Sequence, residues 1–128
     1  MFKTVDIMKL TLEEKLIREY LIEIAKKNEY TVYSELCDEI WNRCGTKLDM
    51  SIPEHRGRIG SILGHISRYE NEEGRPMLSA LVITESTGKP GSGFYKLAED
   101  LGLYTDSMDE KEFSDAEGDR AVAFWQSH

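Results

Sequence analysis

The segment at residues 55–70, HRGRIGSILGHISRYE, carries the polar side chains with the clearest chemical pattern in the chain. If it is helical, four residues at steps of three, four and three share one face: Arg58, Ser61, His65 and Arg68. Arginine pairs with guanine or phosphate through two parallel hydrogen bonds, and serine can bond to either. The row, with Arg56 beside it, predicts contacts with nucleic acid, although any solvated helix face can hold such residues.

Three glycines interrupt the same segment, at positions 57, 60 and 64. Each costs about 0.5–1 kcal/mol in a helix interior relative to alanine, so their presence needs a reason. One interpretation is close packing of this helix on a neighbouring helix or strand. The other is close approach of a ligand or of nucleic acid, and the sequence leaves both open.

A second glycine-rich stretch, TGKPGSG at residues 87–93, predicts a hairpin-like loop with Lys89 exposed at its tip. As a wing over residues 85–93, this loop would place Lys89 over a DNA phosphate. As an ordinary turn it would have no such role. It lacks the GxxxxGK[ST] spacing of a nucleotide-binding P-loop.

No other group of residues has the spacing of a catalytic or metal site. His55 and His65 lie ten positions apart on one predicted helix, about 15 Å by the helical rise, so they cannot share a metal ion or a proton. Cys37 and Cys44 are two helical turns apart, about 10 Å, which is too far for a disulfide, and there is no second pair for zinc. We therefore expect no catalytic residue, no metal, no cofactor and no enzymatic activity.

Three helices must position these residues. The first, from Leu12 to about Lys26, opens with a capping box formed by Thr11 and Glu14. The second spans about 34–44 after a short β-branched stretch at 30–33, and it ends at Gly45. The third covers 53–70 and starts at a proline. Its buried stripe should consist of Ile59, Ile62, Leu63 and Ile66.

The remaining elements predict a small sheet. MLSALVIT at 77–84 has the β-branched content of a strand, and FYKLAEDLG at 94–102 is expected to be a short strand running into a helical turn. The two strands should pair antiparallel around the glycine loop. This order predicts an α+β, winged helix-turn-helix-like domain over residues 1–103.

The charge is unevenly distributed along the chain, whose net charge is −8. Residues 1–97 hold 14 Lys and Arg against 15 Asp and Glu, whereas residues 98–128 hold 2 against 9. The neutral body can therefore still present a basic face. We expect residues 104–128 to form a loosely ordered acidic tail with a docked apolar end at Ala123, Phe124 and Trp125.

No apolar run reaches the length of about 20 residues that a membrane span needs. The first residues, MFKTVDIMKLTLEEK, also lack the apolar core of a signal peptide. We therefore expect a cytoplasmic protein with no membrane partner.

Three segments resemble the C-terminal winged-helix domain of alkylguanine-DNA alkyltransferases and of the non-catalytic alkyltransferase-like proteins. They are TVYSEL at 31–36, RIGSIL at 58–63 and SALVITESTGKPGSGF at 79–94. The resemblance implies that Tyr33 matches the tyrosine that helps to rotate a DNA phosphate, and that Gly60 matches the glycine of the recognition helix. The arginine which that family inserts into DNA would fall on Gly57, between Arg56 and Arg58. The last segment is also similar to small uncharacterised bacterial and phage proteins, which implies no activity.

The chain departs from this family at the reactive residues, and this departure excludes alkyl transfer. Their P-C-H-R quartet would correspond to Ser79-Ala80-Leu81-Val82, so aliphatic residues replace both the reactive cysteine and its histidine. Alkyl transfer needs a thiolate activated by such a neighbour.

The sequence leaves two possible functions open. The first is binding of duplex DNA through the helix at 53–70 and the wing. The second is interaction with a partner protein that has a basic surface, through the acidic tail, as an inhibitor encoded by a phage could do. In a third arrangement the tail would fold over the helix at 53–70 and inhibit DNA binding in cis, so that truncation after Gly102 would strengthen binding.

Overall fold

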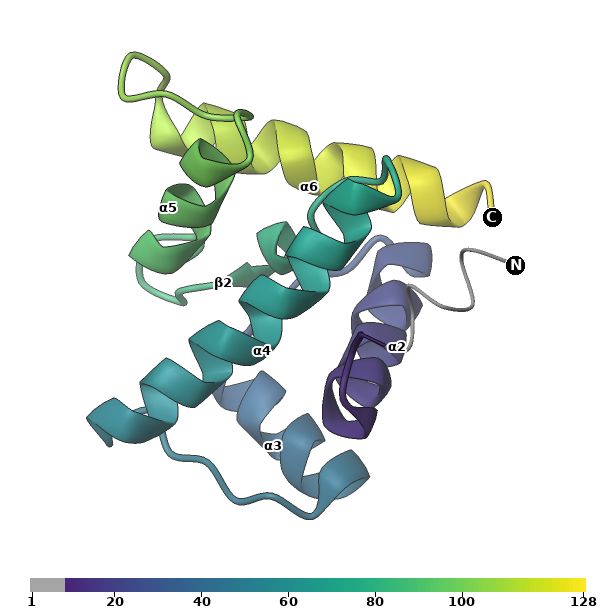
Figure 1. The fold of residues 1–128 in the computed structure, drawn as a ribbon, viewed down its shortest axis with the longest axis vertical. Helices are drawn as coiled ribbons and strands as arrows, with labels where there is room; N and C mark the ends of the chain where they lie inside the picture. Colours follow the sequence, from purple (N-terminus) through teal and green to yellow (C-terminus); the bar gives the residue numbers. More distant parts are fainter. Residues whose placement is uncertain (1–8) are drawn as a thin grey trace.

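The computed structural model describes residues 9–128, which form a mostly helical domain with five α-helices and a two-stranded sheet (Figure 1). In chain order the elements are α2 (Leu12–Lys26), β1 (Thr31–Val32), α3 (Tyr33–Cys44), α4 (Pro53–Glu72), the 3₁₀ helix η1 (Leu78–Leu81), β2 (Val82–Ile83), α5 (Ser92–Asp100) and α6 (Glu110–Gln126). The first three α-helices lie where the sequence predicts them. The capping box at Thr11 and Glu14 is present.

Helix α4 runs through the middle of the domain and contacts α2, η1 and α5 (Figure 1). The predicted buried stripe on α4 is confirmed, because Ile59, Ile62, Leu63 and Ile66 are all buried. They pack in one core with apolar residues of α2 and α3. A second, smaller core lies between η1 and α5, around Met77 and Phe94.

The predicted antiparallel sheet and its wing are wrong. Strand β2 pairs with β1 in parallel, with Thr31 opposite Val82 and Val32 opposite Ile83. The four residues before β2 form η1 and are all buried, so their apolar run cannot distinguish a strand from a buried helical turn. The segment expected as the wing's second strand is helix α5, whose buried Phe94, Leu97 and Ala98 have helical spacing.

The predicted loosely ordered tail is also wrong, because residues 110–126 form α6, which packs against α2 and η1. Ala121 and Val122 are buried there. Glu117 is buried as well, and it accepts a hydrogen bond from the backbone N–H of Met77 at 2.9 Å. Gly118 lets the helix approach Tyr30, since a Cβ at this position would lie 2.1 Å from the Tyr30 hydroxyl oxygen.

Of the apolar end expected to dock, Trp125 packs against the core whereas Ala123 is exposed, and the position of Trp125 joins α6 to two other helices. The carboxylate of Glu70 on α4 is fully buried between Arg18 and Arg75, with N–O distances of 2.7 and 2.8 Å. Both guanidinium groups lie over the rings of Tyr69 and Trp125, at 5.3–5.8 Å from the ring centroids. Cations stacked between aromatic rings hold the end of α6 against the body.

Within residues 9–128, no helix combines the length and the apolar character that crossing a membrane would require.

Candidate functional site

The exposed face of α4 contains the predicted row. Arg58, Ser61, His65 and Arg68 are all exposed to solvent, on the side of the helix away from its buried stripe. Arg68 borders a small hollow that Leu10, Tyr69 and Glu72 also line. The helical spacing therefore predicted correctly which side chains solvent can reach.

Two members of the row are paired with the first turn of α2, which the sequence did not predict. Arg58 donates from Nη2 to Glu13 Oε1 at 2.7 Å, and His65 Nδ1 lies 2.6 Å from Glu14 Oε2. Burial opposes ionisation of Glu13, but the hydrogen bonds from Arg58 and Thr46 outweigh it and lower the pKa of this carboxyl group. The acids that stabilise the start of α2 thus also hold one edge of the row in place.

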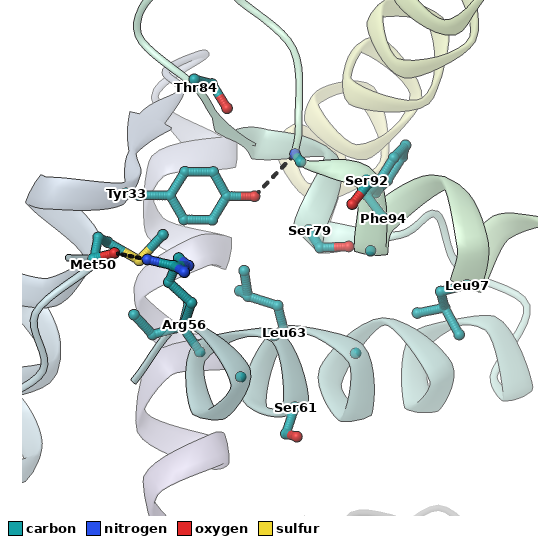
Figure 2. A pocket seen from close by; sticks show the side chains of 16 residues that line it. Tyr33, Met50, Arg56, Ser61, Leu63, Ser79, Thr84, Ser92, Phe94 and Leu97 are labelled. Atoms are coloured by element: carbon teal, nitrogen blue, oxygen red, sulfur yellow. Dashed lines mark hydrogen bonds between the residues drawn. The ribbon is translucent and has the colours of Figure 1, made fainter. Parts of the chain in front are cut away.

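On the opposite edge of α4, a groove of about 690 Å³ separates this helix from α5 and from the start of α3 (Figure 2). Its α4 wall includes Gly57, Gly60, Gly64 and the inward-pointing Leu63. Facing them are, among others, Tyr33, Ser79, Thr84, Ser92, Phe94 and Leu97. Ser61 also borders the groove, although its side chain points to the other side of α4 from Leu63 and is exposed like the rest of the row.

Two predicted DNA-contacting residues sit at one end of this groove, and both have partners within the chain. The Tyr33 hydroxyl oxygen accepts a hydrogen bond from the Gly91 backbone N–H at 3.1 Å, and burial raises the pKa of this tyrosine (Figure 2). Arg56 donates from Nη1 to the carbonyl oxygen of Met50 at 2.8 Å. Tyr33 thereby fixes the start of α5, and Arg56 fixes the segment that leads into α4.

The three α4 glycines are not explained by packing inside the chain. A Cβ added at Gly57, Gly60 or Gly64 would find no neighbouring atom of the described residues within 4 Å. Gly118, by contrast, would clash at once with Tyr30. The interpretation that the α4 glycines serve close packing on a neighbouring helix or strand is therefore wrong, and their bare backbone faces open space.

The groove differs in charge from the rest of this acidic chain. Among the residues that line it in the described part of the chain, Arg56 is the one charged residue, and neither Asp nor Glu is present. The first turn of α5 also opens there, at Ser92 and Gly93, and its N-cap residue Gly91 has no side chain to satisfy the free N–H groups. Both features suit a neutral or anionic occupant better than a cationic one.

Lys89 lies on a closed loop rather than on a wing. The Thr84 N–H donates to the Lys89 carbonyl oxygen and the Gly88 N–H to the Thr84 carbonyl oxygen, each at 2.8 Å. The Lys89 ammonium is 2.5 Å from Glu110 Oε1 at the start of α6. This hydrogen bond to Glu110 raises the pKa of Lys89. The cation expected over a phosphate is thus held by an acid of the chain's own last helix.

Sequence reasoning missed the groove because it assigned part of α5 to a strand. The signals were present: Gly57, Gly60 and Gly64 share a helix face, and the pair Ser92-Gly93 precedes apolar residues with helical spacing.

The described residues contain no group of three or more His, Cys, Asp or Glu arranged to hold a metal ion. Comparisons of the chain with models of protein families, with curated proteins and with solved structures find no match.

Proposed function

We propose that this protein is a non-enzymatic, cytoplasmic DNA-binding module that contacts duplex DNA through the exposed face of α4, in the manner of a recognition helix. The centre of the contact is the bare backbone at Gly57, Gly60 and Gly64. The cations beside it and the loop at 84–91 bind phosphates at its edges.

The open glycines are the observation that carries this proposal. Three glycines weaken α4 by about 1.5–3 kcal/mol in total, and nothing within the described chain needs them. A helix without side chains on one face lets a sugar-phosphate backbone come closer than any other helix surface would. Glycine is the residue that permits such an approach.

The local charge supports the same assignment. From Arg56 to Tyr69 the chain has no acidic residue and three arginines, although its net charge is −8 and Glu13 and Glu14 of α2 reach the same face. Within residues 9–128, Arg58 uses only Nη2 for its partner Glu13, and its side chain is 53% exposed, so its other donors can reach a phosphate. Phosphate contacts of this kind give most of the affinity of nonspecific DNA binding.

The resemblance of three segments to the winged-helix domain of alkyltransferase-like proteins also implies a DNA-binding role, although residues 9–128 do not form the antiparallel wing of that domain. Tyr33 and Gly60, which the resemblance connects with DNA, both line the groove beside α4, although Gly57 stands where that family has the arginine it inserts into DNA. The position corresponding to the reactive cysteine is Ala80, which is fully buried and has no nucleophile. The proposal is therefore binding without catalysis.

The test is the affinity of the full chain for a labelled DNA duplex, measured by fluorescence anisotropy at several salt concentrations. We expect weak binding that falls steeply with salt, and a loss of about tenfold or more at low salt when Arg58 and Arg68 are both changed to alanine. The slope of log K against log salt should fall by about two, one for each lost phosphate contact.

The matched control is Lys26→Ala with Lys27→Ala, which removes the same charge at the other end of α2. Both lysines are exposed, whereas Arg58 pairs with Glu13 at the start of α2. The control should keep most of the affinity. Equal losses in the two double variants would mean that net charge, not α4, governs binding, and this would reject the proposed interface.

A partner protein with a basic surface is the second candidate, favoured by the order of α6. Glu112 and Asp119 are exposed on this helix, and it is held firmly against the body. If the full chain binds no duplex at low salt, this candidate becomes the better explanation. A variant with Glu112→Gln and Asp119→Asn should then lose the partner, while the Arg58 and Arg68 variant keeps it.

A further inference from the structure

The loop at 84–91 and helix α5 after it both contact the start of α6, although Lys89 and Glu110 are 21 positions apart. The Lys89 ammonium pairs with the Glu110 carboxylate at 2.5 Å. Glu110 also accepts, at its carbonyl oxygen, a hydrogen bond of 3.0 Å from the Tyr95 hydroxyl. A Cβ at Gly88 would lie 3.8 Å from Cε of Lys111, so the tip of the loop rests on the first turn of α6.

This contact connects the acidic helix with the proposed DNA-binding face. Thr84 and Gly91, at the two ends of the loop, line the groove beside α4. Lys89, between them, is turned to Glu110. The chain's acidic last helix thus pairs with the one lysine of the loop, while the ends of the loop remain part of the groove wall.

The ion pair between Lys89 and Glu110 is exposed, so another anion can reach Lys89 and displace Glu110. The side chains of Lys89 and Glu110 are 33% and 46% exposed, and ion pairs with such exposure are weak and sensitive to salt. The body of α6 does not depend on this pair, because its docking rests on buried residues further along, such as Glu117, Ala121 and Val122. The pair can therefore break while α6 stays in place.

We propose that Glu110 is an autoinhibitory contact: it occupies Lys89 in the free protein, and a DNA phosphate must displace it before the loop can bind. This inference rests on the proposed DNA-binding function and adds its regulation. It replaces the expectation that a loose tail covers the arginines of α4, because the acid reaches the loop lysine instead. Binding then includes the cost of opening the pair, and any change that removes the Glu110 charge should increase affinity.

The test compares Glu110→Gln with Glu112→Gln in the full chain, using duplex affinity at low salt. Both acids lie in the first turn of α6, so the two variants lose the same charge and the same favourable interaction with the helix N-terminus. Glu110→Gln should bind about two- to fivefold more tightly than the wild type, and the gain should shrink as salt rises. Glu112→Gln should bind within about 1.5-fold of the wild type.

Lys89→Gln completes the cycle. This variant should bind the duplex more weakly than the wild type. Adding Glu110→Gln to it should give no gain in affinity, because the lysine with which Glu110 pairs is already absent. Truncation after Gly102 is less suitable, since it would remove Ala121 and Val122 from the core.

The outcomes separate the two proposals. Equal gains from Glu110→Gln and Glu112→Gln, or a gain from Glu110→Gln that persists without Lys89, would show a general charge effect and overturn the autoinhibitory contact. Wild-type binding with no gain in Glu110→Gln would overturn it while leaving the DNA-binding function intact. If neither the wild type nor any variant binds the duplex, the proposed function fails and the inhibition fails with it.

Discussion

Glycine has two opposite roles in this molecule, and the space around each one distinguishes them. At Gly118 a side chain would collide with the hydroxyl end of Tyr30, so the present packing of this ring on α6 requires a residue without a Cβ. At Gly57, Gly60 and Gly64 a side chain would meet nothing in the described chain. The first role belongs to stability, and the second points to a contact made with another molecule.

Gly118→Ala should therefore destabilise the protein by about 0.5–2 kcal/mol, because the Tyr30 ring must leave its place on α6 and the helix preference of alanine offsets only part of that cost. The new Cβ would lie 2.1 Å from the Tyr30 hydroxyl oxygen and 2.9 Å from Cζ of the same ring. Urea unfolding monitored by circular dichroism measures the change. Adding Tyr30→Phe should recover part of the loss, because it removes the nearer of the two atoms.

A Gly118→Ala protein as stable as the wild type would mean that the contact between Tyr30 and α6 contributes little to stability.

For single residues, the sequence predicted which side chains are exposed better than it predicted which residues they pair with. Helical spacing correctly placed Arg58 and His65 on the exposed face of α4, because periodicity depends only on the helix itself. It could not predict that Glu13 and Glu14 would meet them, because these pairs depend on how α2 packs against α4. Lys89 is the same case, since its partner Glu110 comes from a helix that the sequence did not suggest.

The buried cluster around Glu70 connects several elements: Glu70 lies on α4, Arg18 on α2, Arg75 in the segment after α4 and Trp125 on α6. Its carboxylate is fully buried and is shared by Arg18 and Arg75, which stack between Tyr69 and Trp125. A buried charge is costly unless its partners remain, so the two arginines and the acid depend on one another.

Glu70→Gln should therefore cost about 3 kcal/mol or more of unfolding free energy, because it leaves two largely buried guanidinium groups without their carboxylate. Glu72→Gln is the matched control. Its side chain is 47% exposed and pairs with Lys9 at 3.7 Å. This control should change stability by less than about 0.5 kcal/mol. If the two variants unfold at the same urea concentration, the cluster does not hold α6 to the body.

The elements that the sequence predicted are those whose own residues decide their structure. Helix α2 has a capping box, α3 ends at the left-handed Gly45, α4 starts at a proline, and all three have an apolar stripe. Helix α6 has neither a wide apolar stripe nor a low charge, because its buried side consists largely of small or polar residues such as Ser114, Gly118 and Ala121. Such a helix is stabilised by tertiary packing, which sequence periodicity does not register.

Considered as a whole, the molecule separates its charges. Most of the acidic excess lies in residues 98–128, and α6 carries much of it against α2 and η1. The segment from Arg56 to Tyr69 has no acidic residue. If α4 is the DNA-binding face, this charge distribution would favour the approach of DNA to α4 over its approach to the acidic last helix.

The most direct test of this account is the duplex affinity of a variant with Gly57→Ala, Gly60→Ala and Gly64→Ala, measured at low salt beside the wild type. The three substitutions should raise the free energy of unfolding by about 1.5–3 kcal/mol, because alanine favours the helix and its methyl groups meet nothing within the chain. If the bare backbone of α4 approaches DNA, the same variant should bind at least about tenfold more weakly, a loss of about 1.4 kcal/mol or more. Unchanged affinity in this more stable protein would contradict the claim that α4 is the DNA-binding face.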